Sequence, residues 1–225
     1  MKKTILALSL SLLCVMNVNA QNKTNFEGVI IFSISFEGSG LPPEAAAMLK
    51  GAETVIYIKA DKQRVDMTMP MQSTSTFTDN KSKNSVTLMD IMGKKYLIKM
   101  NEAEIKKEQE TAPEIIINNT DETKIIAGYK CKKAEITVKS GGEKMINVFY
   151  TEEIPTNETK PVFNGLKGVP LEYSVTQGGM EMKFTAKSIT KESVSDSKFE
   201  IPKEGYIETT IEDLQKTMLK QMGGR

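Results

Sequence analysis

Apolar and polar residues alternate along most of this chain, in short segments separated by turn residues. Met180, Met182, Phe184 and Ala186, for example, stand at alternate positions with charged or hydroxyl-bearing residues between them. Successive side chains of a strand point to opposite faces, so this pattern predicts strands with one apolar and one polar face. We expect strands at residues 26–36, 53–60, 63–69, 73–78, 85–91, 94–100, 114–117, 134–139, 143–150, 171–175 and 180–187.

The connections between these segments are short and contain turn residues. Asp61-Lys62, Ser140 to Gly142 and Gly178-Gly179 each join two alternating segments, which predicts hairpins. Consecutive hairpins form an antiparallel meander, and a meander of this length curls because a flat sheet of so many strands is unfavourable. The fold class we predict is mainly β (α+β): a strongly curved antiparallel sheet or half-barrel with a few covering helices.

Helix signals are few. Pro42-Pro43 predicts a short helix over residues 42–50, since proline is tolerated in a first turn, and residues 101–110 form a charged second candidate. A third helix follows Thr209 and Thr210. Either threonine supplies a capping box, and the apolar stripe that follows predicts a lid or brace through Ile211, Leu214, Met218 and Met222.

Residues 1–20 have the pattern of a secretory signal peptide: Lys2 and Lys3, an apolar run too short to span a bilayer, and Ala20 at the expected cleavage site. We therefore expect a periplasmic or secreted protein, cleaved after Ala20, with residues 21–225 forming a single domain. The short positive segment is typical of bacteria. Cys14 raises the alternative of a lipoprotein, but Leu13 is bulky where a lipid-modification signal needs a small residue.

Charge and composition exclude several classes of function. The chain has 30 basic residues, two of them in the leader, against 29 acidic ones, and such a balance argues against a nucleic-acid partner. It has no histidine, the commonest general base and zinc ligand. The carboxylates show no metal-binding spacing. We expect a non-enzymatic protein without catalytic residues, cofactor or metal site, and one that does not span a membrane.

Cys131 is the only cysteine after the leader, so no internal disulfide can form. It shares one strand parity with Tyr129, whereas Ala134, Ile136 and Val138 share the other, so a bulge or an edge must intervene if all are buried. We expect a small buried residue. The alternative is an exposed redox-active thiol whose pKa the neighbouring lysines lower.

Methionine is the compositional feature that bears on ligand binding. The chain has 14 methionines, and several stand at alternate positions of expected strands. Flexible thioether side chains form an adaptable apolar wall, which suits lipids or varied partners. Ordinary core packing is the first alternative, and Cu(I) binding by clustered thioethers is the second. The candidate ligand-binding residues are Met67, Met69, Met180, Met182 and Phe184.

A resemblance to a known family rests on five segments: 126–134 (IAGYKCKKA), 148–151 (VFYT), 166–173 (LKGVPLEY), 199–202 (FEIP) and 205–206 (GY). With these, the chain resembles exported proteins, common in the Bacteroidetes, that carry a C-terminal domain of unknown function. Those proteins are similar to the LolA and LolB lipoprotein carriers. The resemblance implies an incomplete barrel with helices in its mouth, and none of the carriers' functional residues can be placed here.

Together these observations favour a periplasmic carrier-like protein that holds a lipid or a lipidated partner in the concave face of its sheet. The competing interpretation is a structural or interaction module of the cell envelope, with an envelope protein as partner and a cavity filled by its own side chains.

Overall fold

The computed structural model describes residues 26–37, 49–70, 72–111, 113–139, 143–154, 165–177, 180–202 and 204–222. The predicted signal peptide and most of the expected helix at 42–50 lie outside these ranges. The described elements are β1 (Gly28–Glu37), β2 (Glu53–Lys59), β3 (Lys62–Met69), β4 (Gln72–Asp79), β5 (Asn84–Ile91), β6 (Lys94–Met100), α2 (Glu102–Thr111), β7 (Glu114–Ile126), β8 (Tyr129–Lys139), β9 (Glu143–Thr151), β10 (Val169–Gln177), β11 (Met180–Lys191), the 3-10 helix η1 (Asp196–Phe199), β12 (Ile207–Glu208) and α3 (Ile211–Met222).

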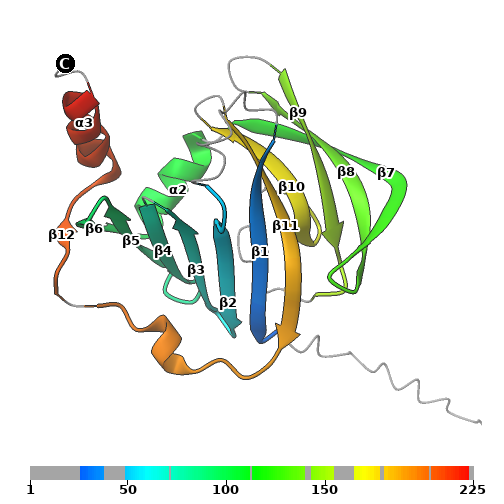
Figure 1. Ribbon diagram of the computed structural model, residues 1–225, viewed down its shortest axis with the longest axis horizontal. Coiled ribbons are helices and arrows are strands. Elements are labelled where there is room, and N and C mark those ends of the chain that lie inside the picture. The colour runs from blue at the N-terminus through cyan, green and yellow to red at the C-terminus, as the bar shows by residue number, and fades with distance from the viewer. Residues whose placement is uncertain are drawn as a thin grey trace, which may run out of the picture.

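The strands form one 12-stranded sheet in the order β12-β6-β5-β4-β3-β2-β1-β11-β10-β9-β8-β7. It consists of two antiparallel meanders, β2 to β6 and β7 to β11, that meet on either side of β1. The sheet is strongly curved but not closed, because β12 and β7 remain as separate edges (Figure 1). The predicted fold class, a curved sheet or half-barrel with few helices, is confirmed. Only the short pair of β12 with β6 is parallel.

β8 begins earlier than expected, at Tyr129, β11 continues to Lys191, and the short β12 was not predicted. Two further differences have a clear physical cause. The β2–β3 turn consists of Ala60 and Asp61, one residue earlier than expected, since Lys59 pairs with Lys62. Both registers place the same side chains on each face, so alternation alone could not distinguish them. The second difference is β7, which continues through a polar stretch to Ile126 instead of ending at residue 117. As an edge strand with most of its side chains exposed, it needs no apolar alternation.

Two helices are confirmed by their caps. Before α2, Asn101 Oδ1 accepts hydrogen bonds from Ala103 N (2.9 Å) and Glu104 N (3.1 Å), and Glu104 Oε2 accepts one from Asn101 N (2.8 Å). Before α3, Thr210 Oγ1 accepts a hydrogen bond from Asp213 N (3.1 Å), so Thr210 is the cap of the two candidates. Each cap satisfies amides that have no partner within the helix.

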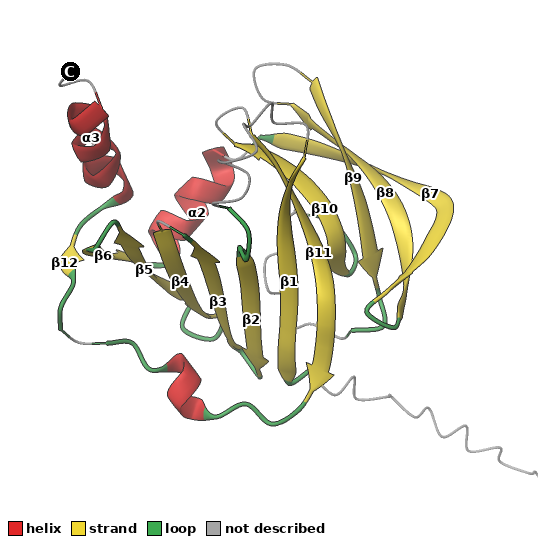
Figure 2. Cartoon of the chain, in the orientation of Figure 1, coloured by secondary structure: helices red, strands yellow, loops and turns green. Residues whose placement is uncertain are grey.

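The two helices occupy different places. α2 contacts β5 and β6, whereas α3 follows β12 and lies beyond that edge of the sheet rather than over its middle (Figure 2). Of the stripe expected to pack, Leu214 is buried, Ile211 is 40 % exposed, and the side chains of Met218 and Met222 lie outside the described part. α3 therefore does not cover the middle of the sheet as a lid, whereas its buried Leu214 fits the brace that the sequence also predicted.

The main core lies where the two meanders meet. It includes Phe32 and Ile34 of β1 and Met182, Phe184 and Ala186 of β11. Tyr173 of β10 stacks on Phe184 with ring centroids 5.0 Å apart and meets Phe32 edge-on at 6.4 Å. These low-polarity surroundings raise the pKa of Tyr173 to about 12. Separate clusters lie around Ile136 in the second meander and around Leu88 in the first.

The aromatic packing provides a test of this core. We expect Phe184→Ala to lower the free energy of unfolding by about 3 to 5 kcal/mol, because it removes a buried ring and leaves a cavity beside Tyr173. Urea denaturation followed by circular dichroism measures the change. Met145→Ala, at a site 64 % exposed on β9, is the control and should cost well under 1 kcal/mol. Equal effects of the two substitutions would contradict this account of the core.

Candidate functional site

The strand register defines two faces of the first meander. Residues that pair across strands lie on the same face, so Ile30, Ile56, Val65, Thr76, Thr87 and Ile98 form one row. The adjacent row contains Phe32, Thr54, Met67, Thr74, Met89 and Tyr96. We call the face that carries these rows the inner face, since it continues into the main core through Phe32. The opposite face is the outer face.

The five predicted site residues do not form one group. Met182 and Phe184 are 6 % and 4 % exposed and belong to the packed core. Met67 and Met69 are half-buried and pack against that core from the first meander. Met180 begins β11, and its side chain lies outside the described part. The structure therefore leaves Met67 and Met69 as the members that a ligand could reach without opening the core. Ligand binding by these residues stays a prediction.

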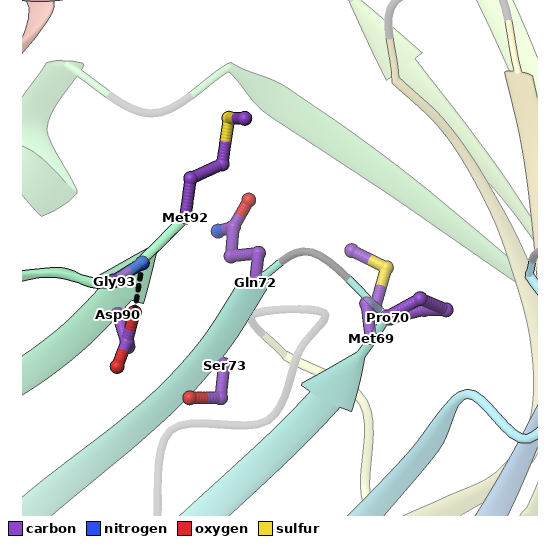
Figure 3. Close-up of a pocket in the computed structure, with 7 residues that line it drawn as sticks. All are labelled: Met69, Pro70, Gln72, Ser73, Asp90, Met92 and Gly93. Atoms are coloured by element: carbon purple, nitrogen blue, oxygen red, sulfur yellow. Dashed lines mark hydrogen bonds between the residues drawn. The ribbon is translucent and has the colours of Figure 1, made fainter.

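A pocket of about 220 Å³ lies beside Met69, between the β3–β4 and β5–β6 turns. Its lining, shown in Figure 3, is Met69, Pro70, Gln72, Ser73, Asp90, Met92 and Gly93. The side chains of Met69, Gln72 and Met92 extend to one side of the strands, whereas Ser73 and Asp90 extend to the other (Figure 3). The pocket is thus an extension of the methionine-bearing end of the inner face.

The β5–β6 turn sets the wall of this pocket. Met92 and Gly93 both have positive φ values, 52° and 84°, as a two-residue hairpin turn of the tightest type requires. Asp90 Oδ1 accepts a hydrogen bond from Gly93 N at 2.9 Å and fixes the turn. Met92 is consequently held out from the sheet and is 75 % exposed. Met92 was not among the predicted site residues. It lies in a turn, and the alternation of apolar and polar residues identifies only side chains within strands.

The inner face also carries hydroxyl groups that the sequence reading missed. Thr74, Thr76 and Thr78 of β4 and Ser85 and Thr87 of β5 lie on it in register, and we call these five residues the hydroxyl strip. The Oγ1 atoms of Thr76 and Thr87 are 3.3 Å apart, within hydrogen-bond distance. The sequence contains a signal for this strip, since threonine recurs at alternate positions of β4. These positions face the same side of the sheet as the apolar residues of β1.

Cys131 is fully buried, as are Ala134 and Ile136 of the opposite parity. The expected bulge is not in β8, which keeps a regular register with β9 from Lys132 to Lys139, and the β7–β8 register shift adds residues on β7. Cys131 and Ala134 are instead buried in separate clusters. Burial is the main cause that raises the pKa of the Cys131 thiol to about 11. The structure therefore supports the prediction that Cys131 is a small buried residue. The lowering of the thiol pKa by a nearby lysine is smaller than the increase caused by burial.

Metal-binding and membrane-spanning features were sought across the described residues. No group of three or more His, Cys, Asp and Glu side chains placed to hold a metal ion occurs among them. Within the same ranges, none of the helices combines the length and the hydropathy needed to cross a bilayer. Cu(I) binding through methionine thioethers alone stays a prediction.

Comparison with protein families shows which family the chain belongs to. A model described as "Domain of unknown function (DUF4412)" matches residues 43–160, which is more than half of the chain. The chain belongs to the DUF4412 family. The matched segment runs from before β2 to beyond β9 and so includes the inner face of the first meander, but not β1, β10 or β11. The domain is thus central in the chain and not C-terminal as expected. A comparison with curated proteins finds no match.

Solved structures show what the chain is similar to in fold. PNGF-II matches with a TM-score of 0.54 at 16 % identity, over 87 % of this chain and 34 % of that one. The chain thus spans about a third of PNGF-II, and at this identity the likeness shows the fold alone. A β-barrel-like protein of the DUF1849 family from Brucella abortus matches at 0.40 and 9 % identity, over 75 % of this chain and 99 % of that one.

LprF from Mycobacterium bovis matches at 0.33 and 11 % identity, over 75 % of this chain and 88 % of that one. The TM-scores of LprF and of the DUF1849 protein are too low to establish a common fold. The curved open sheet implied by the LolA and LolB resemblance is confirmed. Membership of that carrier group and an origin in the Bacteroidetes stay predictions.

The burial of Cys131 predicts low thiol reactivity. At pH 8 the folded protein should react with 5,5′-dithiobis(2-nitrobenzoic acid) far more slowly than the urea-unfolded protein, because the pKa of about 11 leaves almost no thiolate and the sulfur is inaccessible. Since the folded pKa is the higher one, stability due to the neutral thiol is complete below pH 9 and is lost as the pH rises towards 11. Cys131→Ser should weaken that alkaline loss. Rapid labelling of the folded protein would support the redox alternative.

Proposed function

We propose that this protein is a non-enzymatic binding or carrier-like protein that holds a hydrophobic ligand, a lipid or the acyl chain of a lipidated partner, against the inner face of its sheet. The observation that carries the proposal is the half-buried apolar surface of the first meander near the β3–β4 turn. Met67, Met69, Met89 and Ile56 lie there on one face, next to the pocket and only partly covered. Each of these four side chains is half-buried, so part of it is exposed to a ligand.

The energetics favour a chain-like ligand. Apolar surface removed from water contributes about 25 cal/mol per Å², so a ligand that covers several half-exposed side chains gains several kcal/mol. Methionine side chains are unbranched and have three rotatable bonds, so they adapt to an acyl chain with little strain. The pocket, at about 220 Å³, is smaller than typical small-molecule sites and fits one end of such a ligand, with the remainder along the inner face.

The packed core sets the limit of the binding surface. Met182 and Phe184 are nearly inaccessible, and the Phe184 ring is stacked on Tyr173. Displacing them would cost the burial energy of two large side chains, about 1.5 to 3 kcal/mol each. The ligand is therefore placed against Met67 and Met69 and towards the pocket, while Met182 and Phe184 support the surface from below.

A second candidate function is an envelope interaction module, and the observation that favours it is the free edge of the sheet. β7 is an edge strand of 13 residues with exposed Ile116 and Ile125, the latter 67 % exposed. Long edge strands with apolar side chains are sites where another chain can add a strand. Under this alternative the inner face is simply core, and substitutions on β7 rather than on β3 would abolish the interaction.

Binding of Nile red, an uncharged lipophilic dye, tests the proposal. We expect the wild-type protein to enhance its fluorescence saturably. Met69→Glu should weaken binding at least tenfold, about 1.4 kcal/mol, because a carboxylate in the half-buried site must be desolvated, whereas Met92→Glu should weaken it less because its carboxylate stays in water. Met92 is so exposed that its variant should fold normally, as circular dichroism can verify.

The control is Met145→Glu, the same substitution at an exposed methionine of β9. It should leave dye binding unchanged. Absence of saturable binding by the wild type, together with native mass spectra of protein from its own envelope that show no bound lipid, would refute the proposal. An equal effect of Met145→Glu would mean that the dye does not report on the inner face.

A further inference from the structure

The two faces of strands β2 to β5 differ completely in charge. All residues of β2 to β5 are described, and every charged side chain among them stands at an outer-face position, including Lys59, Arg64, Asp66 and Asp90. The inner positions of these four strands hold only apolar, hydroxyl and amide side chains. Lys94, at the exposed start of β6, is the nearest inner-face cation in register and pairs with Ile91 at the rim.

The first meander differs from the centre of the sheet in the face on which it buries an apolar cluster. Its buried apolar cluster of Phe77, Leu88 and Leu97 lies on the outer face, beneath Tyr206 of the segment that leads to β12. The hydroxyl strip on the inner face is half-buried and uncharged. The inner face also buries Ile58 and Ile98, each 5 % exposed, but at its other positions it presents neutral hydrogen-bonding groups next to the methionine-lined surface.

Thr54 marks the inner limit of the accessible surface. It lies in the row between Phe32 and Met67, is 5 % exposed, and its Oγ1 atom has no hydrogen-bond partner among the described residues. A buried hydroxyl without a partner is unfavourable. Because Thr54 is as buried as Met182 and β3 separates it from the hydroxyl strip, the ligand contacts the strip and the methionines but not Thr54.

We infer that the ligand is an uncharged amphipathic lipid whose hydroxyl-bearing head group lies on the hydroxyl strip while its acyl chain lies along Met67 and Met69 towards the pocket. This inference rests on the proposed function and specifies its ligand class. Hydroxyl groups pair well with a neutral head group of the glycerol type. A carboxylate or phosphate placed on the same strip would lose its hydration without meeting a cation on β2 to β5.

Competition between two lipids of equal chain length tests the inference. Below their critical micelle concentrations at pH 8, 1-monomyristoylglycerol should displace Nile red at a concentration at least tenfold lower than myristate does. Native mass spectrometry of each lipid complex gives the same ranking without the dye. The double variant Thr76→Val with Thr87→Val should reduce the preference towards one, because valine keeps the shape and strand propensity of threonine but has no hydroxyl.

The matched control is Thr68→Val, at an exposed outer-face position of β3, and it should leave the preference unchanged. Thr54→Val provides a second control. It should raise the denaturation midpoint, because it removes an unpaired buried hydroxyl, and should leave the lipid preference unchanged, because the ligand does not reach this position.

The outcomes separate the two levels of the proposal. Equal displacement by the two lipids, a preference for myristate, or a preference that survives Thr76→Val with Thr87→Val would overturn the neutral-lipid inference and leave the hydrophobic-ligand proposal standing. Absence of binding by Nile red and by both lipids would overturn the proposed function, and with it the ligand class.

Discussion

The packing of β1 between two meanders is the constraint on which the rest of the structure depends. β1 pairs with β2 on one side and β11 on the other, so its inner residues Ile30 and Phe32 are enclosed by both halves of the sheet. The close approach to β11 requires glycine at position 28, where a Cβ atom would lie 2.1 Å from the carbonyl oxygen of Thr190. The stacked pair of Tyr173 and Phe184 completes this centre. Stability is thus concentrated in the middle of the sheet.

This concentration permits an open sheet at the far end of the first meander. The outer face there is covered by the segment after β11, which is held at several points. Arg64 lies over the rings of Tyr57 (5.8 Å) and Phe77 (5.0 Å) and donates a hydrogen bond to the Lys198 carbonyl at 2.9 Å. Lys59 donates to the Val194 carbonyl at 2.9 Å. Because the outer face supplies the meander with its own buried cluster, the inner face can carry threonines and half-buried methionines.

The division of the inner face follows from this arrangement. Near β1 the inner side chains are large, apolar and packed, which fixes the sheet but leaves no room for a ligand. Two strands further along, Val65 of β3 is followed in the same row by Thr76 and Thr87. The boundary therefore passes between β3 and β4, and Thr54, whose buried hydroxyl has no partner among the described residues, lies on its apolar side. A surface that changes from apolar to hydroxyl-bearing across a few strands suits a molecule that makes the same change along its length.

Local pattern determined most of the secondary structure. Alternation placed ten of the longer strands to within a few residues, as in β6, and the caps of α2 and α3 were encoded in short motifs that act over three residues. Alternation also showed which side chains share a face. It could not show which face is buried, since Met182 and Met67 have the same pattern but only Met182 lies beside the central strand. It missed the length of β7, where an edge strand is free of the apolar requirement. The pairing of β1 with β11, about 150 residues apart in the sequence, decides where the core lies and therefore which methionines stay partly exposed. Only the tertiary structure could decide this, because the burial of a side chain depends on neighbours that are distant in the sequence.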